Sequence, residues 1–170
     1  MLRQQRKDSN FLSCSDFIGN ERNYIGLFAV TAGQNMMNLY KDLENKGDSY
    51  NSIIVQTLAD RMAEASAELL QKYINDNIVP ISIRPAWGYP MLPDQTLLLK
   101  TQSFLPYDKI GIEITENGAM YPPSSISGVF ISNPEAKYFM VGEIGEDQIE
   151  EYAKRRNMPV DKIKALLRQV

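Results

Sequence analysis

Residues 83–94, with the sequence IRPAWGYPMLPD, hold the side chain and the backbone features best suited to binding a small molecule. Three prolines stiffen this segment, and Gly88 allows a ligand to come close to the main chain. Arg84 carries a planar guanidinium group that can bind a carboxylate through two parallel hydrogen bonds. The segment is therefore a candidate binding loop for a ligand with a carboxylate. A structural loop with Arg84 in a surface ion pair explains the same residues, and taken alone the segment favours that simpler interpretation.

The absence of certain residue types excludes several other kinds of chemistry. There is no histidine, which removes the commonest general base, the Ser-His and Cys-His dyads, and imidazole ligation of zinc, haem or cobalt. The single cysteine, Cys14, excludes a disulfide framework and a multi-cysteine metal site. No Gly-x-Gly pair is present, so the glycine-rich turn of common nucleotide-binding sheets is missing. We therefore expect no metal bound by this chain, and any reaction must depend on carboxylates, hydroxyls, the backbone or a cofactor.

Length and charge narrow the class of protein further. A chain of 170 residues suits one compact domain. The net charge of −3 and the pI near 5.1 argue against a nucleic-acid partner, which needs a basic face. No signal peptide and no apolar run of about 18 residues occurs, so we expect no membrane association. A single cysteine fits a reducing cytoplasm.

Apolar periodicity, helix caps, and glycine or proline stops predict the elements that must position the loop. Residues 1–22 are expected to be a connecting segment, and residues 23–170 to form one domain. The predicted strands are 24–31, 110–114, 127–132 and 137–144, of which the last two form a hairpin around Asn133-Pro-Glu-Ala136. The predicted helices are 34–46, 50–73, 95–105 behind an Asp94 cap, 146–156 and 161–169. Together they indicate an α+β fold, a twisted antiparallel sheet with flanking helices.

The long helix at 50–73 carries two kinds of apolar residue. Larger side chains follow the 3.6-residue spacing of an amphipathic helix at Ile54, Leu58, Met62, Ala65 and Leu69. Small residues at Ala59, Ala63 and Ala67 allow another element to pack closely against the helix.

Five stretches of the sequence resemble, in order, successive blocks of one known family. They read NYIGLFAVTAG, LADRMAEASAE, RPAWGYPMLPDQT, TENGAMYPPSSISGVFISNPEAKYF and DQIEEYAKRRNM. The third is similar to the signature Arg-Pro-Ala-x-Gly-Tyr-Pro-x-x-Pro-Asp-His-Thr of the activation domain of cobalamin-dependent methionine synthase. The resemblance covers Ser15 to Leu167, and several motifs in the correct order make it specific.

The resemblance implies the fold and the function of that family. Its members are part of cobalamin-dependent methionine synthase, the 5-methyltetrahydrofolate–homocysteine methyltransferase. They bind S-adenosylmethionine for the reductive methylation that reactivates oxidised cob(II)alamin. The cobalamin is held by another module of the same enzyme, and a flavodoxin or similar donor supplies the electron, so the isolated chain is not expected to make methionine. A stand-alone corrinoid-reactivation factor and a non-catalytic ligand-sensing or docking module remain as alternatives.

The resemblance also implies a binding site for S-adenosylmethionine. Arg84 would hold the methionyl carboxylate, while the backbone at Ala86 and Gly88 would let the nucleoside lie close. Tyr138 and Phe139 are neighbours on a predicted strand, so one side chain should face the ligand and the other the core. Packing alone is the alternative for this aromatic pair. The expected ligand-binding residues are Arg84, Ala86, Gly88, Tyr89, Tyr138 and Phe139.

Charged residues on two helices are candidates for contacts with other modules or proteins. By the resemblance, Asp60 and Glu64 would contact the cobalamin-binding module, while a solvated, salt-bridged helix face explains them equally well. Lys154, Arg155 and Arg156 could meet an acidic flavodoxin. Cations at the C-terminal end of a helix are also expected from the helix dipole alone, and we favour that interpretation.

The sequence departs from the family pattern at several positions. Gln95 and Asn133 stand where the family has histidines, and Trp87 where proline is common, which leaves the carboxylate contact intact. The family's acidic partner for the ligand's amino group lies in an earlier segment that residues 1–170 do not contain. The chain therefore resembles the second half of the activation domain, and we expect it to bind S-adenosylmethionine weakly on its own. Glu116 is the nearest internal substitute for that acid.

Overall fold

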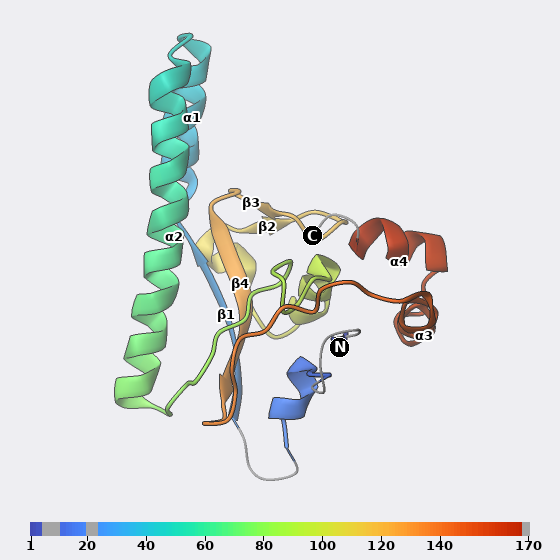
Figure 1. The fold of residues 1–170 in the computed structure, drawn as a ribbon. Helices are drawn as coiled ribbons and strands as arrows, with labels where there is room; N and C mark the ends of the chain where they lie inside the picture. Colours follow the sequence, from blue (N-terminus) through green and yellow to red (C-terminus); the bar gives the residue numbers. More distant parts are fainter. Residues whose placement is uncertain (5–10, 20–23, 168–170) are drawn as a thin grey trace.

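The computed structural model describes residues 1–4, 11–19 and 24–167. Its strands are β1 (Tyr24–Thr31), β2 (Glu113–Ile114), β3 (Met120–Tyr121) and β4 (Ser125–Ser132). Its α-helices are α1 (Gln34–Asn45), α2 (Ser49–Asn77), α3 (Glu146–Arg156) and α4 (Val160–Leu167), and its 3-10 helices are η1 (Cys14–Phe17), η2 (Gln95–Thr101) and η3 (Tyr107–Ile110). Helices around antiparallel strands confirm the expected α+β fold (Figure 1).

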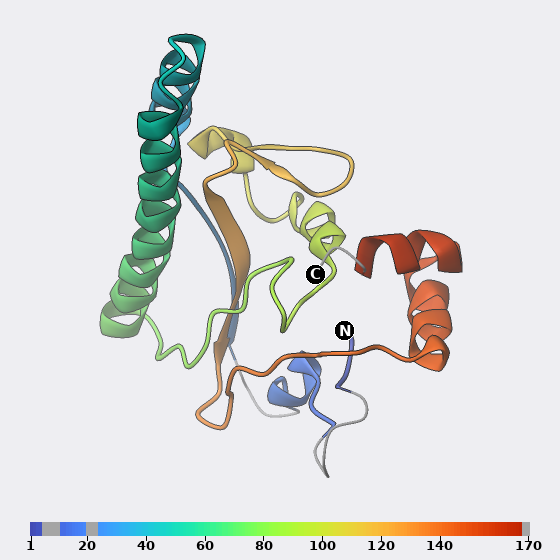
Figure 2. The ribbon, with the colours of Figure 1, turned by 45° about the horizontal axis from the view of Figure 1, so that its top comes forward.

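Strand β4 is the centre of the main sheet. One of its edges pairs antiparallel with β1, from Tyr24 opposite Ser132 to Thr31 opposite Ser125. Its other edge binds the main chain of residues 82–87 through ladder hydrogen bonds. Residues 125–131 are all buried, because the α1–α2 hairpin lies on one side of β4 while the loops and α3 lie on the other (Figure 2). Strands β2 and β3 form a separate small ribbon.

Helix α2 packs against the sheet through its small side chains. Ala59, Ala63 and Ala67 are between 0 and 4% exposed. Ala63 and Ala67 share a buried cluster with Phe28 and Phe130, whose stacked rings have centroids 4.6 Å apart. The close packing predicted for the alanines is therefore confirmed.

The larger apolar residues of α2 are not on the packed face. Ile54, Leu58, Met62 and Leu69 are 45%, 52%, 44% and 69% exposed, and Ala65 is exposed as well. Alanines bring the helix backbone close to the sheet, so the two phenylalanines of the sheet fill the space between the layers. The spacing of the large residues predicts the helix correctly but not the face that it buries.

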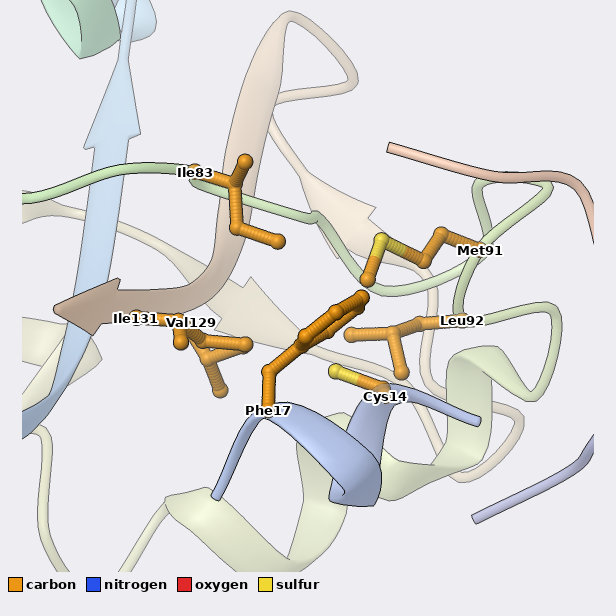
Figure 3. Close-up of a cluster of buried hydrophobic side chains, with 7 residues drawn as sticks. All are labelled: Cys14, Phe17, Ile83, Met91, Leu92, Val129 and Ile131. Atoms are coloured by element: carbon orange, nitrogen blue, oxygen red, sulfur yellow. The ribbon is translucent and has the colours of Figure 1, made fainter. Parts of the chain in front are cut away.

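On the other side of β4 a second cluster draws on distant parts of the chain (Figure 3). It comprises Cys14, Phe17, Ile83, Met91, Leu92, Val129 and Ile131. Val129 and Ile131 alternate along β4 with Phe130, which explains why they face away from α2. Cys14 and Phe17 belong to the predicted connecting segment, so its described part packs into the core. The domain boundary at residue 22 stays a prediction.

The buried thiol of Cys14 is expected to make the protein less stable above about pH 9. Burial raises the pKa of this thiol from 9.0 to about 11, so between these values the unfolded chain loses the proton while the folded chain keeps it. The free energy of unfolding should then fall by up to about 1.4 kcal/mol per pH unit. Urea unfolding of the parent and of Cys14→Ala across this range measures the effect. A difference between the two proteins that stays constant with pH would contradict it.

The predicted hairpin after residue 127 is wrong in one of its two strands. The turn itself forms, because the Ala136 N–H donates a hydrogen bond to Asn133 O at 2.9 Å. Residues 137–144, however, form no strand. β1 and residues 82–87 already occupy both edges of β4, so no edge is left for a hairpin partner.

Two further elements differ from their predictions. The helix expected at 95–105 is the 3-10 helix η2, which ends at Thr101, although Asp94 caps it as predicted by accepting from the Thr96 N–H. The strand expected at 110–114 is reduced to β2, because η3 occupies residues 107–110 and ends at Gly111 in the left-handed region, with φ 73°. The predicted bounds of α3 are confirmed. Residues 168–169 of the last predicted helix lie outside the described residues.

Candidate functional site

The candidate binding loop is held in place by hydrogen bonds to β4. The Val129 N–H donates to Pro85 O, and the Trp87 N–H donates to Ser127 O, both at 3.0 Å. Gly128 makes this contact possible, because a Cβ at that position would lie 2.2 Å from Pro85 O. The loop therefore lies against the backbone of β4, and its prolines alone do not fix its path.

Gly88 forms the turn that follows. Its φ of 82° lies in the left-handed region, which glycine adopts without a steric cost. Its N–H donates to Leu92 O at 2.9 Å, and the Leu92 N–H donates to Tyr89 O at 2.8 Å. Tyr89 therefore lies at the tip of a closed turn.

Residues 138–141 run beside the loop. The Val141 N–H donates to Pro90 O at 2.9 Å, and the Arg84 N–H donates to Tyr138 Oη at 2.8 Å. Tyr138 is 60% exposed, whereas Phe139 packs against the buried clusters on this side of the sheet. Phe139 therefore faces the core, as expected for one of the pair, although the segment is not a strand.

These segments and α2 enclose a pocket of about 380 Å³. Its wall contains five of the six residues expected to bind the ligand, namely Arg84, Ala86, Tyr89, Tyr138 and Phe139. Gly88 does not line the pocket but shapes the turn beside it. The other lining residues are Glu64, Pro85, Pro90, Met91, Ile126 and Met140. The structure thus brings the expected residues together, while their roles in binding stay predictions.

A larger hollow of about 500 Å³ adjoins this pocket at Pro90 and Met140, which line both. It lies between residues 140–144, α3 and α4, and the charged residues that line it within the described part of the chain are Glu143, Glu146 and Lys164. Lys164 and Glu146 form an ion pair with each other. None of the residues expected to bind the ligand belongs only to this hollow, so the smaller pocket is the candidate site.

Arg84 is the positive charge of the pocket, and two glutamates of α2 lie near it. Its Nη1 is 3.6 Å from Glu64 Oε2, and its Nη2 is 3.7 Å from Glu68 Oε1. Both separations are longer than a hydrogen bond, so these ion pairs hold the guanidinium loosely. The Arg84 side chain is only 15% exposed, while that of Glu68 is 76% exposed. The guanidinium therefore lies mostly out of solvent at the wall of the pocket.

Glu64, predicted only as a contact with another module, also lines the pocket. Its Oε1 accepts a hydrogen bond from Tyr89 Oη at 3.0 Å. Burial, followed by this hydrogen bond to Glu64, raises the pKa of Tyr89, so the tyrosine remains a donor at neutral pH. The sequence shows Glu64 and Glu68 one turn apart on a helix, but it does not show which loop that helix meets.

The other charged candidates lie outside the pocket. Asp60 Oδ1 accepts a hydrogen bond from Ser124 Oγ at 2.6 Å. Glu116 is exposed and does not line the pocket. Arg155 pairs with Glu151 at 2.6 Å. The roles of Asp60 and Glu64 as contacts with another module stay predictions.

Arg156, a candidate for meeting an acidic partner, is instead buried. Its side chain is 5% exposed, and its Nε lies 3.2 Å from Asp94 Oδ2, without the alignment of a hydrogen bond. The same carboxylate oxygen accepts from Tyr152 Oη at 2.6 Å, and Arg156 Nη2 donates to Thr96 Oγ1 at 2.7 Å. Burial, and then the hydrogen bond to Asp94, raise the pKa of Tyr152. This network joins the end of the binding loop to α3, so Arg156 is unavailable to a partner.

Within the described residues, no group of three or more acidic, cysteine or histidine side chains is arranged to hold a metal ion. No helix there is long and apolar enough to cross a membrane.

Fold and pocket together define an α+β domain with an arginine and a glutamate in the wall of a small pocket. A family model described as the activation domain of vitamin B12-dependent methionine synthase matches residues 1–81 and 80–157. The chain therefore belongs to this family, and the resemblance seen in the sequence is confirmed. A solved structure, the MetH reactivation domain bound to AdoHcy, has a TM-score of 0.85 and 35% sequence identity to this chain. The match covers 99% of this chain and 59% of that one, so the chain spans a little over half of that relative.

Proposed function

We propose that this chain binds S-adenosylmethionine in the Arg84 pocket and serves the reactivation of oxidised cob(II)alamin by reductive methylation. It would do so as part of cobalamin-dependent methionine synthase, a methyltransferase. The observation that carries this proposal is the pocket itself, which gathers Arg84, Tyr89 and Tyr138 within the fold of the family. The matching MetH reactivation domain was solved with AdoHcy, the demethylated form of the same ligand.

The residues of the pocket fit the groups of S-adenosylmethionine. Arg84 can bind the carboxylate through two parallel hydrogen bonds. To do so its guanidinium group must give up only the long ion pairs with Glu64 and Glu68. The rings of Tyr89 and Tyr138 can offer π faces to the sulfonium, a contact worth roughly 0.5–2 kcal/mol. Ala86 lines the pocket and has a small side chain, so the nucleoside can lie close to the backbone there. The pocket volume of about 380 Å³ falls within the roughly 300–1,000 Å³ of small-molecule sites.

The proposed reaction depends on parts that this chain does not supply. Cobalamin, held by another module of the enzyme, supplies the nucleophilic cobalt that accepts the methyl group, and a flavodoxin or similar donor supplies the electron. This chain would hold and orient the methyl donor. Moving a methyl group in this way transfers no proton, so the site needs no histidine. Asp60 and Glu64, both on α2, are the proposed contacts with the cobalamin-binding module. We propose a cytoplasmic location because the chain keeps one buried, unpaired thiol.

Arg84→Ala is the direct test of the proposed site. Losing a charge-assisted bidentate contact should weaken binding of S-adenosylmethionine by about 1.5–3 kcal/mol, or about tenfold to a hundredfold in Kd. The free energy of unfolding should change by less than about 1 kcal/mol, because the ion pairs of Arg84 are long and partly exposed. Titration calorimetry and urea unfolding measure the two quantities.

Arg155→Ala provides the matched control for this test. Arg155 also forms an ion pair, at 2.6 Å with Glu151, but it lies on α3 outside the pocket. This variant should bind S-adenosylmethionine like the parent. Equal ligand affinity in the parent and in Arg84→Ala would overturn the assignment of the pocket.

A further inference from the structure

Residues 138–140 form one wall of the pocket, although they belong to no strand. Two main-chain contacts hold this wall. The Val141 N–H donates to Pro90 O at 2.9 Å, and Gln4 Nε2 donates to Met140 O at 2.7 Å. We infer that Gln4 is a positioning residue, which sets the place of this wall for the ligand. The inference rests on the proposed function and gives the N-terminal residues a part in ligand binding.

The carboxamide of Gln4 is held at both of its polar atoms. Its Oε1 accepts from the Leu12 N–H at 3.3 Å, while the Gln4 N–H donates to Leu12 O at 2.9 Å. The Leu12 N–H needs an acceptor and Met140 O needs a donor, so the carboxamide fits in one orientation only. Gln4 therefore links the N-terminal residues to the wall, and it is more than a polar side chain on the surface.

Apolar side chains hold the N-terminal residues against the same wall (Figure 2). Leu2 is 5% exposed and shares a buried cluster with Val141, against which Phe139 also packs. By contrast, Tyr138 and Met140 are each 60% exposed and line the pocket. The wall is thus packed on the side of the N-terminal residues and open on the side of the ligand.

A shift of the wall would reach Arg84 through one hydrogen bond. Tyr138 Oη accepts from the Arg84 N–H at 2.8 Å, and both residues line the pocket. Gln4 itself does not line the pocket, so it acts on the ligand only through the wall. Small displacements of binding groups are enough to weaken a fitted ligand.

A second glutamine ties the N-terminal residues to α3 without touching the wall. Gln148 Oε1 accepts from the Arg3 N–H at 2.8 Å, and Gln148 Nε2 donates to Arg3 O at 2.9 Å. Both glutamines thus accept one main-chain N–H and donate to one main-chain oxygen. Gln148 is therefore a matched control, because its loss loosens the N-terminal residues and leaves the hydrogen bond to Met140 in place.

The test is titration calorimetry of the full 170-residue chain with S-adenosylhomocysteine. Gln4→Glu keeps the acceptor for the Leu12 N–H but places a carboxylate oxygen opposite Met140 O. It should weaken binding about threefold to tenfold. Gln4→Met removes the donor without adding a charge and should weaken binding by a similar factor. Gln148→Glu should stay within about twofold of the parent.

Amide hydrogen exchange separates a displaced wall from a general loss of stability. In both Gln4 variants, the Val141 N–H should exchange about threefold to tenfold faster than in the parent. The Val129 N–H, which donates to Pro85 O on β4, should keep its parent rate. In Gln148→Glu both amides should exchange as in the parent.

Failure of the parent chain to bind S-adenosylhomocysteine would overturn the proposed function and this inference together. Normal binding by the parent and by both Gln4 variants would overturn this inference alone. Equal weakening in the Gln4 variants and in Gln148→Glu would also overturn it, because any loosening of the N-terminal residues would then suffice. Faster exchange of Val129 together with Val141 would have the same meaning.

Discussion

Replacing Asp94 with alanine is expected to lower the free energy of unfolding by about 3–5 kcal/mol. Asp94 is 1% exposed and lies 3.2 Å from Arg156, whose side chain is 5% exposed. Without the carboxylate, the buried guanidinium has no opposite charge. The hydroxyl of Tyr152 and the N–H of Thr96 lose their acceptor at the same time. Urea denaturation of the parent and the variant measures the loss.

Two companion variants separate the charge from the hydrogen bonds. Tyr152→Phe removes one hydrogen bond to a buried carboxylate and should cost about 1.5–3 kcal/mol, less than Asp94→Ala. The double variant Asp94→Leu with Arg156→Met replaces the ion pair by apolar side chains, so it should lose less stability than Asp94→Ala alone. A loss below about 1 kcal/mol for Asp94→Ala would mean that the pair behaves like an exposed surface ion pair, which contradicts its burial.

Gly128→Ala is expected to impair both stability and ligand binding. The new Cβ would lie 2.2 Å from Pro85 O and 2.7 Å from the Cα of Ala86. Both contacts are with backbone, which cannot rotate away as a side chain can. The binding loop must therefore move off β4 and lose the hydrogen bond between Val129 and Pro85. Overpacking of this kind costs about 1–3 kcal/mol or more, and the shifted loop should bind S-adenosylhomocysteine at least about tenfold more weakly.

Gly26→Ala is the matched control on the neighbouring strand. Gly26 pairs with Phe130 across the β1–β4 ladder, and a Cβ there would lie 3.4 Å from the side chain of Phe130, an ordinary contact. The free energy of unfolding of the Gly26→Ala variant should stay within about 1 kcal/mol of the parent value, because alanine in a strand also restricts the unfolded chain. Equal stability and equal ligand affinity in Gly128→Ala and Gly26→Ala would show that the loop does not depend on the close contact with β4.

Together the two variants probe the two supports of the pocket. Gly128 lies beneath the start of the binding loop, on the central strand. Asp94 ends the loop and joins it to α3 through Tyr152 and Arg156. Neither residue lines the pocket, so each acts on ligand binding only by positioning the residues that do.

The sequence by itself determined the features that depend on neighbouring residues. The bounds of α3 follow from its apolar spacing and from the Asn157 and Pro159 that end it. Gly47, with φ 75°, follows the end of α1, one residue beyond the helix predicted at 34–46. The loop at 83–94 was identified from its prolines and from Arg84, and the order of its motifs identified the family. Caps, stops and φ restrictions operate within one turn of chain, so a local reading of the sequence detects them.

Only the tertiary structure decided which distant segments meet. β4 pairs with β1 and with residues 82–87, so the strand predicted at 137–144 had no free edge and did not form. α2 buries its alanines and exposes its larger apolar residues because the stacked rings of Phe28 and Phe130 lie beneath it. That choice of face also turns Glu64 toward Arg84. Pairing and packing of this kind depend on the edges and volumes that other segments leave free, and those are set by the whole chain at once.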